Sequence, residues 1–317
     1  MTPENQMPEK PNPRSRRRGA LLVSLLVSLV LAGSWCGWQW RHFLPDDQFS
    51  VSASIAGVDR QIQVDVFLPG NAGSAHNDLP AIALLHGVEG AERYRAAHFR
   101  TARWLADQGF AVYFVHYFDG VDYPDLWLLR DDGELDTDAI DQACRNDAEK
   151  WTAAATAALR SIAARPEVDA ARIVLDGNSL GGFVALSAVA EARTSADIPD
   201  PCAVVVNWGA LFATTRIEPG FPPTLFVHGE LDEIVPVKSA RSASEAIRSV
   251  GSEATLFVVP GASHVARSHE SDALTMGFLS RHAPPAGAVA ASQAAAPVSK
   301  EMGVDASLLR LVSPFFQ

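Results

Sequence analysis

One serine stands between two glycines at residues 177–181, in the run Gly177-Asn178-Ser179-Leu180-Gly181. The apolar residues before it predict a strand and those after it predict a helix, which is the context in which a G-x-S-x-G pattern indicates a nucleophile. Such a turn strains the serine backbone, and glycines allow the strand and helix to approach closely. The helix N-terminus would offer free N–H groups to a developing oxyanion. The alternative interpretation is a glycine-rich turn with an incidental serine.

Two further predicted strands end in the partners that a serine nucleophile needs. The segment "HGELDEIVP" supplies Asp232, and "PGASH" supplies His264. A hydroxyl is a weak nucleophile until a base takes its proton, and the base needs an orienting carboxylate. Ligands of open α/β sheets bind at the carboxyl ends of the strands, so we expect Ser179, Asp232 and His264 to meet there. Glu230 lies too close to the strand end, and Glu233 is expected to point elsewhere.

An oxyanion hole is predicted from the backbone of two other residues. The segment "HGVEG" follows the apolar run "AIALL", so the N–H of Val88 could bind the oxyanion together with that of Leu180. His86 and His228 precede glycines at strand ends, and we expect them to shape loops by hydrogen bonding. His116 also ends a predicted strand, and contact with substrate is a minor alternative for it.

The segment 117–136 lies between a predicted strand and a long predicted helix and is rich in aromatic residues. These side chains could line a pocket for an aromatic or acyl group. Equally, they could only pack the loop against the domain. The four residues concerned are Tyr117, Phe118, Tyr123 and Trp127.

The rest of the chain alternates strands with helices, which predicts an α/β fold with a mostly parallel sheet covered on both faces. A hairpin is expected within 50–70, followed by continuous apolar runs typical of buried parallel strands. The whole unit spans 50–282 as one domain. The expected strands are 81–87, 110–117, 172–177, 202–209, 224–229 and 254–261, and the expected helices are about 93–108, 138–164, 180–192, 237–250 and 266–282.

With these motifs in this order, residues 50–282 resemble an α/β-hydrolase, and their capless layout resembles the dienelactone hydrolase family. The resemblance implies a catalytic triad, and the H-G-x-x-D-x-x-V-P run of related hydrolases places the acid at Asp232. Members of that family typically carry a cysteine nucleophile, whereas this chain has Ser179. A serine esterase is therefore favoured over a dienelactone hydrolase in the strict sense.

The N-terminal region predicts a membrane anchor. Residues 1–18 are net basic. Residues 19–40 contain no charged residue, and this segment is long enough for a transmembrane helix. Arginines before the segment and tryptophans at its far end place the N-terminus in the cytoplasm and the catalytic domain on the trans side, periplasmic or extracellular. The alternative is a cleaved signal peptide and a secreted enzyme. Residues 41–49 are expected to be a linker, and 283–317 an Ala/Pro-rich tail.

Composition excludes several partners. The chain of 317 residues carries a net charge of −11 with a basic excess only at its N-terminus, so nucleic-acid binding is not expected. No histidine pair has metal-ligand spacing with a matching third ligand, and neither a metal nor another cofactor is expected. Cys144 and Cys202 are predicted near opposite edges of the sheet, too far apart for a disulfide. The sequence does not indicate an oligomeric state.

The leading hypothesis is a membrane-anchored serine hydrolase that cleaves a small carboxylic ester or lactone through an acyl-enzyme. Ser179 would attack, His264 would relay the proton and Asp232 would orient His264. One alternative is a serine peptidase of the prolyl-oligopeptidase type, although the chain leaves no room for the large gating domain of that group. Another is a non-catalytic binding protein with a vestigial triad.

Overall fold

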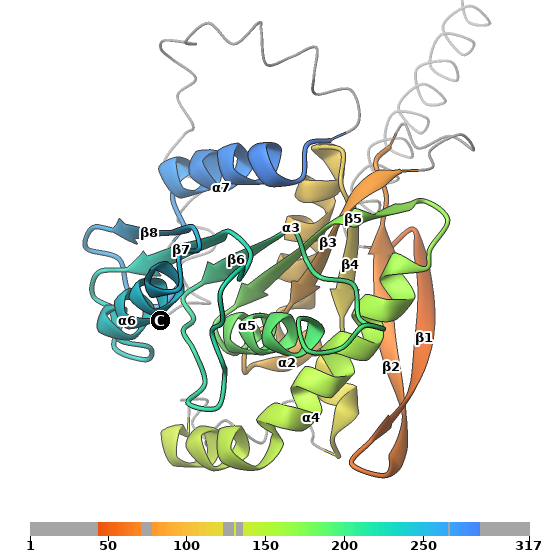
Figure 1. The fold of residues 1–317 in the computed structure, drawn as a ribbon, viewed down its shortest axis with the longest axis horizontal. Helices are drawn as coiled ribbons and strands as arrows, with labels where there is room; N and C mark the ends of the chain where they lie inside the picture. Colours follow the sequence, from red (N-terminus) through yellow and green to blue (C-terminus); the bar gives the residue numbers. More distant parts are fainter. Residues whose placement is uncertain (1–43, 71–77, 123–129, 131–135, 266, 286–317) are drawn as a thin grey trace, which may run out of the picture. The chain divides into compact units, whose positions relative to one another are not determined.

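The computed structural model describes residues 44–70, 78–122, 130, 136–265 and 267–285. Their strands form one eight-stranded sheet in the order β1-β2-β4-β3-β5-β6-β7-β8 (Figure 1). The hairpin strands β1 and β2 are antiparallel to each other, β2 is antiparallel to β4, and the remaining pairs are parallel. The strands are β1 (Asp47–Ile55), β2 (Val58–Phe67), β3 (Leu79–Leu85), β4 (Ala111–Val115), β5 (Val168–Asn178), β6 (Ala203–Asn207), β7 (Thr224–Gly229) and β8 (Ala254–Val259).

Helices cover both faces of the sheet, and each face has its own apolar cluster. On one face, α4 (Thr137–Ala163), α5 (Leu180–Ala192) and α6 (Val237–Ser249) pack against the sheet. On the other, α3 (Arg95–Asp107) and α7 (His269–His282) do so. The central strands β3 and β4 are buried along their whole length, which explains their continuous apolar sequences.

The predicted alternation of strands and helices is confirmed, and the differences lie at element boundaries. β5 begins at Val168, before the apolar run; residues 169–172 are Asp, Ala, Ala and Arg and are partly or fully exposed, so the apolar pattern did not reveal this part of the strand. The helix expected from 93 is divided at Tyr94 into α2 (Gly90–Arg93) and α3. The last helix begins at His269, because Ser268 and Ser271 form a reciprocal capping box there. A short 3-10 helix, η1 (Tyr117–Gly120), was not predicted.

The predicted membrane anchor, 19–40, lies outside the described residues, as do the basic segment 1–18 and the tail from 286 onward. Within the part of the chain that the structure describes, no helix has both the length and the apolar character needed to span a membrane. The anchor therefore stays a prediction from the sequence.

Candidate active site

Ser179 lies at the sharp turn from β5 into α5. Its backbone has a φ of 51° and a ψ of −119°, a left-handed conformation that is strained for a residue with a side chain. Two hydrogen bonds hold the turn: the Ser179 N–H donates to the Asn207 carbonyl at 2.7 Å, and the Gly182 N–H donates to the Ser179 carbonyl at 2.8 Å. The neighbouring strand β6 thus restrains the strained residue directly.

The glycines of the motif are required by close backbone contacts. A Cβ atom on Gly177 would lie 2.2 Å from the Gly181 carbonyl oxygen, and one on Gly181 would lie 2.4 Å from the His86 carbonyl oxygen. Both distances are far below van der Waals contact, and both obstacles are backbone atoms. Any side chain at either position would therefore separate α5 from β5 or from the end of β3.

The structure brings Ser179, His264 and Asp232 together in one hydrogen-bonded chain. His264 Nε2 lies 2.9 Å from Ser179 Oγ, and His264 Nδ1 lies 2.8 Å from Asp232 Oδ2. An ionised carboxylate can only accept, so Nδ1 carries the proton and Nε2 offers its lone pair to the serine hydroxyl. The Asp232 side chain is fully buried and that of His264 is 15% exposed, so His264 is the more accessible of the two.

Asp232 is held in its ionised form. Burial alone would raise the pKa of its carboxyl, but hydrogen bonds from His228, His264 and the Val235 N–H outweigh burial and place the pKa well below its usual range. The Ile234 and Val235 N–H groups donate to Oδ1 at 3.0 and 2.9 Å. The turn after β7 therefore folds around the carboxylate and leaves Oδ2 for His264.

His228 provides a second imidazole beside the same carboxylate. Its Nε2 lies 2.6 Å from the Val235 carbonyl oxygen and 3.1 Å from Asp232 Oδ2. Because a carbonyl can only accept, Nε2 carries the proton. The ring is fully buried in β7. The predicted loop-shaping role is confirmed for His228, and the structure adds that the loop it shapes is the one that carries Asp232.

The two residues predicted to form the oxyanion hole leave the same edge of the sheet. Leu85 and Gly177 are register partners in β3 and β5, and Val88 and Leu180 each follow three residues later. Leu180 is the first residue of α5, so its N–H has no acceptor within the helix. This placement is consistent with the predicted role, which stays a prediction.

The aromatic residues predicted to line a pocket are placed differently from one another. Tyr117 is fully buried, donates a hydrogen bond from its hydroxyl to the His86 carbonyl at 2.8 Å and stacks on the His86 ring. Phe118 is 5% exposed and packs near Trp151 of α4. These two side chains pack inside the domain, as the second interpretation of that segment expected. Tyr123 and Trp127 lie outside the described residues.

The other singled-out residues are accounted for by structural contacts. His86 Nδ1 lies 2.8 Å from the Gly87 carbonyl, and burial lowers the pKa of this imidazole to about 3, so it is neutral. His116 pairs with buried Asp65 at 2.8 Å. Cys144 and Cys202 are free thiols, and burial raises the pKa of each to about 11. Among the described residues, no cluster of His, Cys, Asp and Glu could hold a metal ion.

Sequence reasoning missed Trp208, which follows β6 and has a positive φ of 57°. Its ring centroid lies 6.2 Å from that of His264, and the residue is 7% exposed. Trp208 is the residue before the last in the predicted strand 202–209, so its position near the carboxyl edge was the available signal. Trp208 thus lies beside the base, at the same edge of the sheet.

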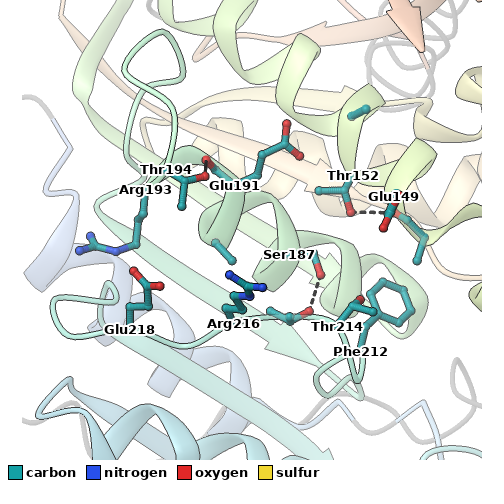
Figure 2. A pocket seen from close by; sticks show the side chains of 14 residues that line it. Glu149, Thr152, Ser187, Glu191, Arg193, Thr194, Phe212, Thr214, Arg216 and Glu218 are labelled. Carbon is teal, nitrogen blue, oxygen red and sulfur yellow. Dashed lines mark hydrogen bonds between the residues drawn. The ribbon is translucent and has the colours of Figure 1, made fainter. Parts of the chain in front are cut away.

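A sizeable cavity lies elsewhere. Figure 2 shows a hollow of about 470 Å³ between α4, α5 and the segment 212–218, lined mainly by charged and hydroxyl side chains. Ser179, Asp232 and His264 are not among its lining residues. This cavity therefore lacks the hydrogen-bonded serine and histidine, and we place the candidate site at Ser179, His264 and Asp232.

The sheet order, the strained serine turn and the three residues at the strand ends define an α/β-hydrolase. The chain belongs to the dienelactone hydrolase family, whose family model matches residues 66–296. This membership confirms the resemblance drawn from the motifs. It also supports a carboxylic ester hydrolase as the class of enzyme.

Solved structures of esterase 2 from Thermogutta terrifontis share this fold. The tabun-phosphoramylated form has a TM-score of 0.56 and 18% identity, covering 76% of this chain and 97% of that one. The propionate-bound form has a TM-score of 0.54 and 19% identity, covering 76% and 96%. A curated protein, the non-reducing polyketide synthase ausA of Aspergillus calidoustus, is 44% identical over 43 residues. That match covers 14% of this chain and 2% of the synthase.

Proposed function

We propose that this protein is a serine esterase in which Ser179 is the nucleophile, His264 the general base and Asp232 the residue that orients the base. The observation that carries the proposal is the continuous hydrogen-bonded chain from Ser179 Oγ through the His264 ring to Asp232 Oδ2, with links of 2.9 and 2.8 Å. The position of this serine on a strained turn at the start of a helix adds the free N–H groups that acyl transfer needs.

The reaction proceeds in two halves. Ser179 Oγ attacks the ester carbonyl while its proton passes to His264 Nε2, and the resulting oxyanion is stabilised by the N–H groups of Leu180 and Val88. The intermediate collapses to an acyl-enzyme as His264 gives the proton to the departing alcohol. Water then attacks the acyl-enzyme with His264 again as base, and the carboxylic acid leaves. Asp232 stabilises the imidazolium formed in each half.

The surroundings of the triad favour an apolar substrate. Three large hydrophobic side chains lie within two residues of Asp232 or His264 in the sequence and are exposed: Leu231 at 60%, Ile234 at 46% and Val265 at 57%. The related Thermogutta esterase is described with propionate bound and with organophosphorus agents attached. We therefore infer a small ester with a short or medium acyl group, and a nucleophile that reacts with fluorophosphonates.

A fluorophosphonate probe tests the proposal. Wild-type protein should be labelled covalently and should hydrolyse a panel of p-nitrophenyl esters, whereas Ser179→Ala should lose labelling and nearly all turnover. Near-normal ester hydrolysis by a folded Ser179→Ala variant would refute the triad. Hydrolysis of a peptide amide in preference to every ester of the panel would favour the peptidase alternative, and labelling without turnover of any substrate would favour a binding protein.

We also propose that residues 19–40 anchor the enzyme in a membrane, with the catalytic domain on the trans side. The support is the sequence alone: a charge-free segment preceded by arginines and ending in tryptophans. Reporters fused after residue 317 test the orientation. A fused alkaline phosphatase should be active in the periplasm, and a reporter active only in the cytoplasm would overturn the topology. Recovery of a soluble mature form lacking the segment would indicate cleavage instead.

A further inference from the structure

A second buried carboxylate lies close to the triad and takes no part in the mechanism above. Asp176 is in β5, three residues before Ser179, and is 4% exposed. Its register partners are Leu84 in β3 and Val205 in β6, both buried and apolar. Burial raises the pKa of this carboxyl to about 7, against the attraction of Arg267. A carboxyl group in such surroundings costs stability unless it is hydrogen-bonded.

The first partner leads to the nucleophile. Asp176 Oδ1 accepts a hydrogen bond from the Asn207 side-chain amide at 2.8 Å. The carbonyl of the same Asn207 accepts the N–H of Ser179 at 2.7 Å. Asn178 and Asn207 form the last register pair between β5 and β6. Asp176 therefore reaches the Ser179 backbone through one intervening residue, at the point where the sheet ends and the strained turn begins.

A second charged group near Asp176 comes from the loop that carries His264. Asp176 and Arg267 line the same small polar cavity of about 20 Å³, together with Asn207 and Asp272 of α7. Arg267, three residues after His264, donates to Asp272 at 2.9 Å and to the hydroxyl of Thr101 at 3.2 Å. Among the described residues that line this cavity, Arg267 and Asp272 are the other charged ones.

We propose that Asp176 is a positioning residue for the nucleophile, which acts through Asn207 to fix the backbone of Ser179. This inference rests on the proposed function, because it assumes that Ser179 attacks. The physical reason is the left-handed conformation of Ser179, which persists only where its surroundings hold it. A carboxyl that fixes the Asn207 side chain fixes the β6 end, and with it the acceptor of the Ser179 N–H. Displacement of a reacting group by about 1 Å can cost on the order of 10²-fold in rate.

The test compares kcat and KM on one activated ester for three variants. Asp176→Leu removes the acceptor and should lower kcat by about 30- to 100-fold with little change in KM. Asp176→Asn keeps an acceptor oxygen in the same place and should restore kcat to within a few-fold of wild type. Asn207→Ala removes the intermediary and should match Asp176→Leu. The Asp176→Leu/Asn207→Ala double variant should be no slower than the slower single variant, because both act on one path.

Thr224→Val is the matched control. Thr224 is also fully buried, in β7, and its hydroxyl donates to the Pro222 carbonyl at 3.0 Å at the strand end remote from Asp232. This variant should lose a buried hydrogen bond and some thermal stability without a change in kcat. A general effect of core damage would lower kcat in Thr224→Val as well and would overturn the inference.

Other outcomes separate the inference from the proposed function. If the Ser179→Ala variant is not labelled by the probe but still hydrolyses the ester, the proposed function fails irrespective of Asp176. If Ser179→Ala is inactive but Asp176→Leu and Asn207→Ala both keep normal kcat, the triad stands and the positioning role is refuted. Should Asp176→Leu not fold, Asn207→Ala decides: a normal kcat overturns the inference, and a loss in kcat alone supports it.

Discussion

Two buried carboxylates at the same edge of the sheet behave in opposite ways. Asp232, after β7, is 6% exposed and Asp176, near the end of β5, is 4% exposed, so burial penalises the charge of both. The pKa of Asp232 nevertheless lies well below its usual range, whereas that of Asp176 is raised to about 7. The difference lies in the donors. Asp232 receives two backbone N–H groups and lies beside two imidazoles, and Asp176 receives one side-chain amide.

The comparison shows that burial does not by itself decide the charge of a carboxylate. Hydrogen-bond donors arranged around Asp232 replace the water that this carboxylate loses on burial, so it stays ionised at neutral pH. Asp176 lacks such donors and holds its proton up to about neutral pH. The first residue can stabilise an imidazolium, and the second is suited to hold a neighbouring amide. The same Asp→Asn substitution at each position should therefore have different results.

The largest effect is expected for Asp232→Asn. The amide would no longer hold His264 in the tautomer that accepts the serine proton, nor stabilise the imidazolium, so kcat should fall on the order of 10⁴-fold, as in a serine protease triad. The measurement is kcat on one activated ester at neutral pH, beside Asp176→Asn. A loss of only a few-fold at Asp232, with a collapse at Asp176, would reverse the assignment of the two carboxylates.

The second prediction concerns stability and pH. A carboxyl whose pKa is raised to about 7 on folding binds its proton more tightly in the folded state, so it lowers the free energy of unfolding as pH rises from about 4 to about 7. Asp176→Asn removes this dependence. Relative to wild type, the variant should therefore gain roughly 2 to 3 kcal/mol in unfolding free energy between pH 5 and pH 8.

Urea unfolding of both proteins at the two pH values measures this difference, because other titrating groups cancel in the comparison. An unchanged difference between pH 5 and pH 8 would show that Asp176 is already ionised at pH 5. The same comparison on Asp232→Asn should show almost no change between pH 5 and pH 8. The pKa of Asp232 is lowered on folding, so its contribution to the free energy of unfolding is fully present above its unfolded pKa and is lost only as pH falls below that value.

The sequence was sufficient for the order of elements and for the meeting of Ser179, Asp232 and His264. Buried parallel strands are continuous apolar runs, and their carboxyl ends share one edge, so residues just after such runs must converge. The contacts of Asp176 were not predictable in this way. They depend on the lateral register of β5 and β6, which pairs Asn178 with Asn207, and no local pattern encodes that register.

The aromatic residues of segment 117–136 show a second limit of prediction from sequence. Tyr117 and Phe118 follow a strand end as Ser179, Asp232 and His264 do, so their position suggested a substrate surface. A 3-10 helix instead turns both residues back into the core, against His86 and Trp151. The direction of a short irregular turn depends on what it packs against, and aromatic composition alone does not reveal it.

A smaller effect is expected at His228, which helps to give Asp232 its low pKa. His228→Leu removes a donor from the Asp232 carboxylate and from the Val235 carbonyl, and should lower kcat about tenfold through a less fixed acid loop. His228→Gln places an amide N–H near the position of Nε2 and should recover most of the loss. A kcat unchanged in both variants would mean that the two backbone N–H groups and His264 alone suffice to hold Asp232.

The smallest effects are expected for the two glutamates that flank Asp232. Glu230 is exposed, and its carboxylate accepts the Gly261 N–H at 2.8 Å, in the loop that leads to His264. Glu230→Gln keeps an acceptor oxygen for that N–H, and Glu233→Gln changes an exposed side chain, so each should stay within a few-fold of wild type in kcat. Glu230→Ala removes the acceptor and is expected to cost more than Glu230→Gln, while Glu233→Ala is its matched control. If Glu230→Gln lost activity as severely as Asp232→Asn, the charge that supports His264 would belong to Glu230, and the contrast between Asp232 and Asp176 would lose its catalytic meaning.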